Sequence, residues 1–220
     1  MGTNLPLIDQ ITGNASPAIK RAFLNPGMVF PTLDHDGKYR VLGFAMETIF
    51  QRVAVTDISS SNSWGGSQPS SDGDPGEQRP EGSQVWSIIL MCKVDVFPDM
   101  ANNHHILHGG CTAFLIDMCS SLAVVALTMI MKSPDSTNVE SFPLKFDLLS
   151  QSLNVVYHSP APVGDSLRIV CTTMPSTSES GSNVCVRTEI WSMHRHCLVA
   201  SGVHTMMKMS TRSKSSISRL

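Results

Sequence analysis

The stretch Asn102-Asn103-His104-His105-Ile106-Leu107-His108-Gly109-Gly110 runs directly into an apolar segment that continues from Cys111 to Met131. This pattern predicts one long helix over 108–131. The segment is long enough to cross a bilayer and is apolar on nearly every face. Asp117 lies inside it, however, and a sheet wrapped around a helix also requires a helix that is apolar all round. We therefore expect a buried core helix and no membrane span.

The two glycines and the acid of this segment carry its chemistry. Gly109 and Gly110 leave backbone N–H groups uncovered at the positive end of the helix, where they are suited to polarise a carbonyl oxygen. A tight turn alone would also account for two adjacent glycines. Asp117 favours the functional interpretation, because an acid in an apolar helix is costly unless it is paired or functional. Such a carboxylate can activate water or attack an acyl carbon directly.

The spacing of these groups predicts a shared site. Gly110 and Asp117 are seven residues apart, which is roughly 10 Å along a helix. One carbonyl group cannot contact both when they belong to the same helix. Two such helices running antiparallel across a two-fold axis would bring each helix start to the acid of its neighbour. We therefore expect a dimeric active site.

The remainder of the chain reads as a short early helix, capped by Ser16, and several antiparallel strands. Together with the long helix this predicts an α+β domain in which the helix packs on one sheet. We divide the chain into an N-terminal extension (1–40), a core domain (41–209) with a Ser/Gly/Pro-rich insertion at 59–83, and a C-terminal tail (210–220). The predicted strands are Val41–Ile58, Val85–Val96, Ser150–His158, Ser166–Met174, Asn183–Met193 and Leu198–Met209.

Three blocks of residues resemble a known family. They are Asn102…His108-Gly109-Gly110…Asp117, then Tyr157-His158-Ser159-Pro160-Ala161 with Gly164-Asp165, and Ala200–Thr205 in the last strand. The pattern is similar to that of the hotdog-fold acyl-CoA thioesterases of the phenylacetate-pathway and thioesterase superfamily member 2 type. The resemblance covers residues 85–208 and implies an antiparallel sheet wrapped around a long central helix.

The resemblance also implies roles for individual residues. Gly109 would donate its N–H to the oxyanion, with Gly110 beside it, and Asp117 would be the nucleophile or general base. Asn102 would orient water, Ser150 would support it, and His108 would shape the helix start. Tyr157, Ser159 and possibly His204 would border the coenzyme A part of an acyl-CoA substrate. A homodimer or homotetramer is implied, and no cofactor or metal is required.

Other interpretations of the same residues stay open at this point. A non-catalytic acyl-CoA binding protein would use the same fold, although such a binder has no need of the acid. A hotdog hydratase would have a His five residues after the Asp, where this chain has Leu122. A metal site at His104, His105 and His108 lacks a matching carboxylate or Cys. A Cys nucleophile lacks a visible His partner.

Composition and the chain end bear on location. The net charge of −2 does not indicate the basic surface that binds nucleic acid. The six cysteines form no C-x-x-C pair, and the first 24 residues lack the pattern of a secretory signal, which favours a reducing compartment. Ser218-Arg219-Leu220 is a variant of the peroxisomal address, so we expect the import receptor as a partner and peroxisomal localisation, with the cytoplasm as the alternative.

Overall fold

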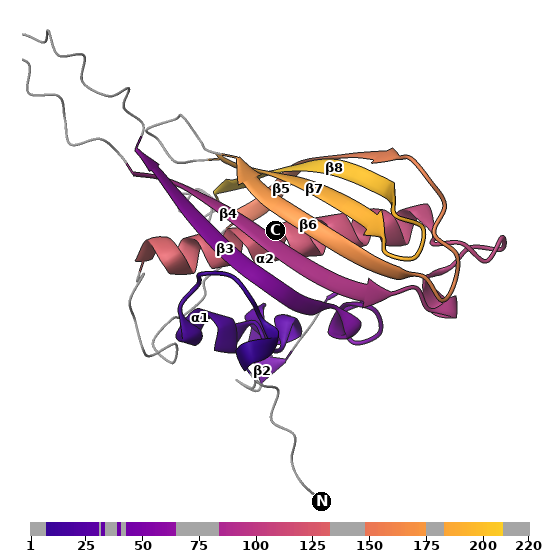
Figure 1. Cartoon of the computed structure of the whole chain (residues 1–220), viewed down its shortest axis with the longest axis horizontal. Helices are drawn as coiled ribbons and strands as arrows, with labels where there is room; N and C mark the ends of the chain where they lie inside the picture. The colour runs from indigo at the N-terminus through magenta and orange to yellow at the C-terminus, as the bar shows by residue number, and fades with distance from the viewer. Residues whose placement is uncertain are drawn as a thin grey trace, which may run out of the picture.

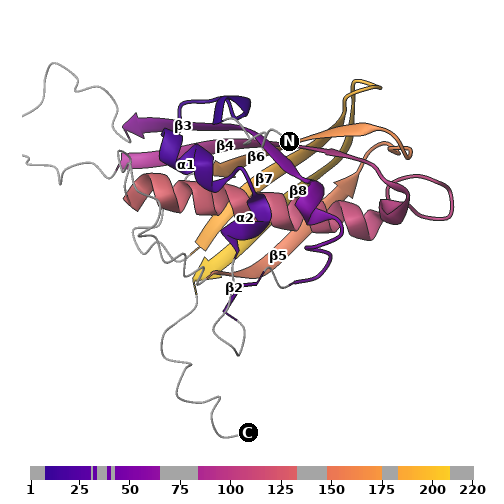
Figure 2. The same cartoon turned by 90° about the horizontal axis from the view of Figure 1, so that it is seen from below.

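One long helix, α2 (Gly109–Lys132), runs across the concave side of a six-stranded antiparallel sheet (Figures 1 and 2). The structure is a computed structural model that describes residues 8–30, 32–33, 39–40, 43–64, 84–132, 148–174 and 183–208. The expected architecture, an α+β hotdog fold with its sheet around a central helix, is confirmed.

The sheet has the strand order β3-β4-β6-β7-β8-β5. Strands that are neighbours in the sheet pair antiparallel throughout. Hairpins join β3 to β4 and β6 to β7 to β8, whereas the chain crosses the sheet twice, from β4 through α2 to β5 and from β5 back to β6. The predicted last four strands are confirmed within two residues at each end. The strands are β3 (Ala54–Trp64), β4 (Gln84–Asp95), β5 (Leu148–Tyr157), β6 (Ser166–Met174), β7 (Asn183–Ser192) and β8 (Cys197–Lys208).

The helix α2 is buried on more than one side, which explains its unusual composition. Leu115, Ile116 and Leu122 are fully buried together with inward side chains of the sheet such as Leu90 and Ile169. The helix is long and apolar enough to span a membrane, yet 72% of its most apolar 18-residue stretch is buried inside the fold. The sheet and the N-terminal elements therefore account for its apolar faces without a bilayer.

The N-terminal residues belong to this core rather than standing apart from it. Helix α1 (Pro17–Ala22) forms as expected, with Ser16 Oγ accepting a hydrogen bond from Ile19 N at 3.4 Å. Ile19 and Phe23 are buried in the same cluster as the residues of α2. The short 3₁₀ helices η2 (Pro26–Val29) and η3 (Phe50–Arg52) pack near α1, on the side of α2 away from the sheet (Figure 2).

The prediction of one strand over Val41–Ile58 is wrong for its first part. Residues 43–52 form turns that end in η3, and β3 begins only at Ala54. The reason lies in the spacing of the buried side chains, because Met46, Phe50 and Val53 recur every three or four residues. That period places them on one face of helical turns, whereas a half-buried strand would alternate every second residue.

The predicted insertion at 59–83 begins too early. β3 continues to Trp64 and pairs with β4 down to the Trp64–Gln84 pair, so residues 59–64 are part of the hairpin. A Ser-rich sequence is compatible with a strand when a partner satisfies its backbone hydrogen bonds. Residues 65–83, the connection at 133–147 and the tail with Ser218-Arg219-Leu220 lie outside the described residues.

The outer edge of β3 is covered by an N-terminal strap, residues 11–15. Thr12 N donates to Thr56 O at 2.9 Å, Ile58 N donates to Thr12 O at 3.2 Å, and Ala15 N donates to Ile58 O at 3.1 Å. Gly13 lies at the centre of the strap with φ of +89°, and a Cβ there would lie 2.2 Å from the Ile58 carbonyl oxygen. The strap therefore requires glycine at this position for both backbone conformation and space.

We expect Gly13→Ala to lower the free energy of unfolding by about 2–4 kcal/mol, because it adds a left-handed Ala and a backbone clash. Gly164→Ala is the matched control, since Gly164 has φ of +88° but a Cβ there would meet nothing within 4 Å. It should cost only about 1–2 kcal/mol. Urea unfolding of both variants measures the difference. Equal losses would contradict the close approach of the strap to β3.

Candidate active site

The loop before α2 is shaped by Asn102. Its side-chain Oδ1 accepts a hydrogen bond from His104 N at 2.9 Å, and its backbone carbonyl accepts one from His105 N at 3.0 Å. The turn is closed by Asn102 N, which donates to Ile106 O at 2.8 Å. Asn102 Oδ1 is thus occupied by the loop, and no described residue accepts from its Nδ2. The predicted water-orienting function would have to use this Nδ2 group.

His108 caps the start of the helix, as the resemblance implied. Its Nδ1 accepts a hydrogen bond from Gly110 N at 2.9 Å, and its carbonyl accepts one from Thr112 N at 2.9 Å. Among the described residues, no acceptor bonds to the N–H of Gly109. Because a helix start carries the positive end of the dipole, this amide is available to a developing negative charge. The geometry therefore distinguishes Gly109 from Gly110.

The space beside Gly109 is bordered by Tyr157. The Tyr157 hydroxyl donates to Gly109 O at 3.1 Å, and a Cβ on Gly109 would make ordinary contacts of 3.4–3.5 Å with the same ring. Tyr157 is 58% exposed. Ser159 is half-buried and its N–H donates to Val199 O at 3.2 Å, so its hydroxyl is the group left for other contacts. Tyr157 therefore lies at the helix start, whereas the hydrogen bond of Ser159 is with Val199 of β8.

Asp117 lies farther along α2 and faces the edge strand β5. Ser150 Oγ donates to Asp117 Oδ1 at 3.4 Å, which is long for a hydroxyl donor. His204 Nε2 lies 3.4 Å from the same oxygen. The Asp117 side chain is 38% exposed, and no described residue donates to its Oδ2. One carboxylate oxygen is therefore bound within the chain and the other is open to a ligand.

A β-bulge in β5 directs Ser150 toward the helix. Ser150 pairs with Met206 but Ser152 pairs with Thr205, so Gln151 is the extra residue. Met206 and the neighbouring His204 of β8 are buried and face α2. Because strand side chains alternate between faces, the extra residue puts both Ser150 and Leu153 on the inward side. The bulge thus brings Ser150 within reach of Asp117.

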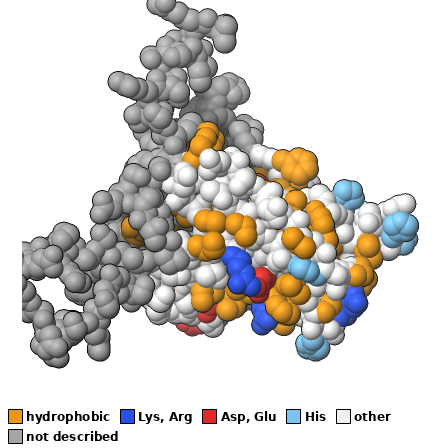
Figure 3. Space-filling view, turned by 90° about the horizontal axis from the view of Figure 1, so that it is seen from above, with side chains coloured by type: hydrophobic (Ala, Val, Ile, Leu, Met, Phe, Trp, Pro, Cys, Tyr) orange, Lys and Arg blue, Asp and Glu red, His pale blue; other side chains and the backbone are white. Residues whose placement is uncertain are grey.

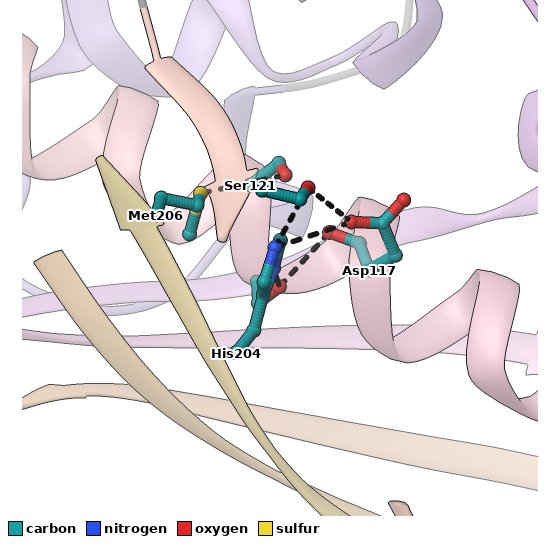
Figure 4. Close-up of polar contacts among 6 residues, drawn as sticks. Asp117, Ser121, His204 and Met206 are labelled. Carbon is teal, nitrogen blue, oxygen red and sulfur yellow. Dashed lines mark hydrogen bonds and ion pairs between the residues drawn. The ribbon is translucent and has the colours of Figure 1, made fainter. Parts of the chain in front are cut away.

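His204 is fully buried, which differs from the expected contact with coenzyme A. Its Nδ1 lies 2.7 Å from Ser120 Oγ and its Nε2 lies 2.9 Å from Ser150 Oγ (Figure 4). Burial lowers the pKa of His204 below its ordinary value of 6.5, against the opposing effect of the Asp117 carboxylate. A neutral imidazole at this position supports the acid and its serine rather than binding a ligand on the surface.

Two groups of residues result, at two places on one helix. Asn102, His108, Gly109, Gly110 and Tyr157 gather at the helix start, whereas Asp117, Ser120, Ser150 and His204 gather around the acid. No hydrogen bond or ion pair joins the two groups within the part of the chain that the structure describes. Gly109 and Asp117 are eight residues apart, or about 12 Å along the axis. A carbonyl group cannot contact both within one chain.

Ser120 is the member of this site that the sequence interpretation missed. Its hydroxyl bonds to Asp117 O at 2.9 Å as well as to His204. The available signal was its position three residues after Asp117, on the same side of an apolar helix. A hydroxyl there is costly to bury unless it is hydrogen-bonded, as the acid is.

The alternative chemistries find less support in this geometry. In the described ranges, no three His, Cys, Asp or Glu side chains gather as they would around a metal ion. Burial raises the pKa of the Cys111 thiol to about 11, so it is protonated near neutral pH. A hydrogen bond with Cys92 and burial raise the pKa of Cys119 well above its usual value. These thiols are poor nucleophiles.

Comparison with known proteins finds similarity in solved structures alone. No protein-family model matches the chain, and no curated protein matches its sequence. Thioesterase superfamily member 2 of Mus musculus is 24% identical, over 56% of this chain and 81% of its own, with a TM-score of 0.42. PaaI of the E. coli phenylacetic acid degradation operon is 15% identical, over 55% and 76%, with a TM-score of 0.43. A hypothetical thioesterase of Streptococcus pneumoniae, solved with coenzyme A, is 16% identical, over 56% and 79%, with a TM-score of 0.43.

The neutral burial of His204 predicts a dependence of stability on pH. Because folding depresses its pKa, the unfolded chain binds the proton more readily below 6.5. The stability that His204 contributes is present above that pH and is lost as the pH falls below it. Between pH of about 7.5 and about 5, the wild type should lose more free energy of unfolding than His204→Gln, which lacks the imidazole. Urea unfolding at both pH values tests this, and parallel losses would contradict it.

Proposed function

We propose that this chain hydrolyses an acyl-CoA thioester to a free acid and coenzyme A, in a site that two copies build together. The observation that carries the proposal is the pair of open groups on α2. The Gly109 N–H has no acceptor and Asp117 Oδ2 has no donor among the described residues, and each is held by neighbours that fix its direction. An amide donor and a carboxylate are the two groups that hydrolysis of a thioester requires.

The Gly109 amide would bind the thioester carbonyl oxygen. Negative charge develops on that oxygen when the carbonyl carbon is attacked, and a helix-start N–H stabilises it without reorganising. His108 supports this role because it takes the Gly110 N–H at 2.9 Å and so fixes the first turn. Tyr157 fixes the other side of the same peptide through Gly109 O. Asn102 Nδ2 and the Ser159 hydroxyl would contact water or substrate beside it.

Asp117 would activate the water or attack the acyl carbon itself. Its Oδ1 is engaged by Ser150 and lies against His204, so Oδ2 is the oxygen that takes the proton or forms the bond. The Ser150 hydroxyl would then help to position the water. A general base leaves no covalent intermediate, whereas direct attack gives an acyl-aspartyl anhydride that water must open. Both routes use the same residues.

A second copy of the chain would supply the missing half of each site. The strand β5 is the uncovered edge of the sheet, and side chains along it and on β8 are apolar and exposed, including Leu149, Val156 and Tyr157. The outer backbone N–H and C=O groups of such an edge can pair with another strand. A two-fold axis beside β5 would set the two α2 helices antiparallel and bring the Gly109 of one chain to the Asp117 of the other. The site is incomplete without that partner.

Acyl-CoA as the substrate class follows the resemblance of the three sequence blocks to hotdog acyl-CoA thioesterases. On the face that Figure 3 shows, the Lys and Arg side chains are scattered among hydrophobic and other side chains. A non-catalytic acyl-CoA binding protein is the second candidate. A protein that only binds acyl-CoA would not need the β-bulge, Ser150 and the buried imidazole of His204 that hold Asp117.

Asp117→Ala should lower kcat for thiol release from acyl-CoA esters by 10²-fold or more, roughly 3 kcal/mol of barrier, because it removes the base or nucleophile. A panel of short, long and aryl acyl-CoA esters with a thiol reagent measures this. Asp95→Ala, which removes an exposed acid on β4, is the matched control and should keep full activity. Tight acyl-CoA binding without turnover in the wild type would favour the non-catalytic protein.

The shared site predicts complementation between two inactive variants. Gly109→Pro removes the N–H at the first helical position, where proline is well tolerated, and Gly109→Ala keeps the N–H as its control. Co-expression of Gly109→Pro and Asp117→Ala with different affinity tags yields a purified mixed dimer. One of its two sites has both groups intact, so we expect about half of the wild-type activity. A mixed dimer as inactive as its parents would place both groups in one chain.

A further inference from the structure

The hydroxyl groups of Ser120 and Ser150 and the imidazole of His204 form a hydrogen-bonded network beside Asp117, in which each hydrogen can be assigned. Ser120 is fully buried and has one hydroxyl hydrogen for two acceptors, Asp117 O at 2.9 Å and His204 Nδ1 at 2.7 Å. Ser150 likewise has one hydrogen for two acceptors, Asp117 Oδ1 at 3.4 Å and His204 Nε2 at 2.9 Å. The tautomer of His204 decides where both hydrogens go.

The tautomer with hydrogen on Nδ1 leaves two acceptors of this network with a single hydrogen between them. Nδ1–H would donate to Ser120, and Ser120 would donate to Asp117 O, which already lies within the helix. The bare Nε2 would then face Asp117 Oδ1 at 3.4 Å, acceptor against acceptor. Both would compete for the single hydrogen of Ser150. Because His204 is fully buried, water cannot supply a hydrogen to its Nε2, and the opposition is costly.

The tautomer with hydrogen on Nε2 gives every link from Ser120 to the carboxylate one donor and one acceptor, and leaves Asp117 O to the backbone N–H groups of its own helix. Ser120 donates to Nδ1, Nε2–H donates to Ser150 Oγ, and Ser150 donates to Asp117 Oδ1. Each hydrogen bond then runs in the same direction, toward the carboxylate, and successive bonds of this kind reinforce one another. The shortest contact of the network, 2.7 Å, is the one from Ser120, at the end most distant from the carboxylate.

We infer that Ser120 is a positioning residue of the proposed thioesterase, holding His204 as the Nε2–H tautomer so that Ser150 gives its hydrogen to Asp117 Oδ1. This inference rests on the proposed function for its effect on catalysis. Its consequence is a choice between the two carboxylate oxygens. Oδ1 is held by Ser150 and His204, and Oδ2 reacts. Ser120 itself is buried and touches no substrate, so it affects kcat through orientation and leaves substrate binding unchanged.

Nitrogen NMR of the wild-type histidine rings tests the tautomer directly. The His204 signals are identified by their loss in His204→Gln. We expect Nε2 to carry the hydrogen and Nδ1 to show the shift of a nitrogen that accepts a hydrogen bond. In Ser120→Ala that hydrogen-bond shift should disappear. Hydrogen on Nδ1 in the wild type, or an Nδ1 signal unmoved by Ser120→Ala, would overturn the inference whether or not the chain hydrolyses thioesters.

Kinetics tests the effect on catalysis, with a control on the next residue. Ser120→Ala should lower kcat by about tenfold or more and leave KM within about twofold, as loss of a residue that orients a site commonly does. Ser121→Ala removes a hydroxyl that is also buried and whose hydrogen-bond partner among the described residues is Met206 Sδ, at 3.8 Å, and should keep wild-type kinetics. Equal kinetics of the two variants would overturn the positioning role. If the wild type shows no turnover, the proposed function fails, and the NMR result alone decides the tautomer.

Discussion

The fold depends on the burial of a helix that is apolar around its whole circumference. A sheet can cover only one side of α2, so the remaining sides need other partners. The N-terminal elements supply one of them, which is why Ile19, Phe23 and Phe50 join the same core as the sheet residues. The strip that carries Gly110 and Asp117 is left partly exposed. In the proposed dimer, a second copy of the chain covers that strip.

The open strip places a positive helix start and a negative side chain on one rigid element. Their separation along the axis is fixed by helix geometry and cannot be adjusted by loop movement. The structure orients each group locally, through His108 and Tyr157 at one end and through Ser150 and His204 at the other. Two copies related by a two-fold axis satisfy both constraints at once, with identical surfaces on either side.

The sequence predicted the long helix and the last four strands well because their signals are local. Apolar runs of sufficient length and alternating residues bounded by turns leave few alternatives. The turns at 43–52 were mistaken for strand because β-branched and aromatic residues there outweighed a helical spacing. The positions of His204 and Ser120 beside Asp117 could not be predicted from the sequence, for another reason. They depend on the register of β8 against α2 and on a bulge at Gln151, which no local pattern specifies.

The strap at residues 11–15 has a consequence for how far the protein can assemble. A sheet with two free edges can add strands at both, and repeated head-to-tail addition leads to fibres. Here the backbone of Thr12 and Ala15 occupies groups along β3 that a further strand would need. The proposed pairing through β5 would use the same edge in both copies and leave none for a third. With the strap on β3, the growth of the sheet would then end at two copies.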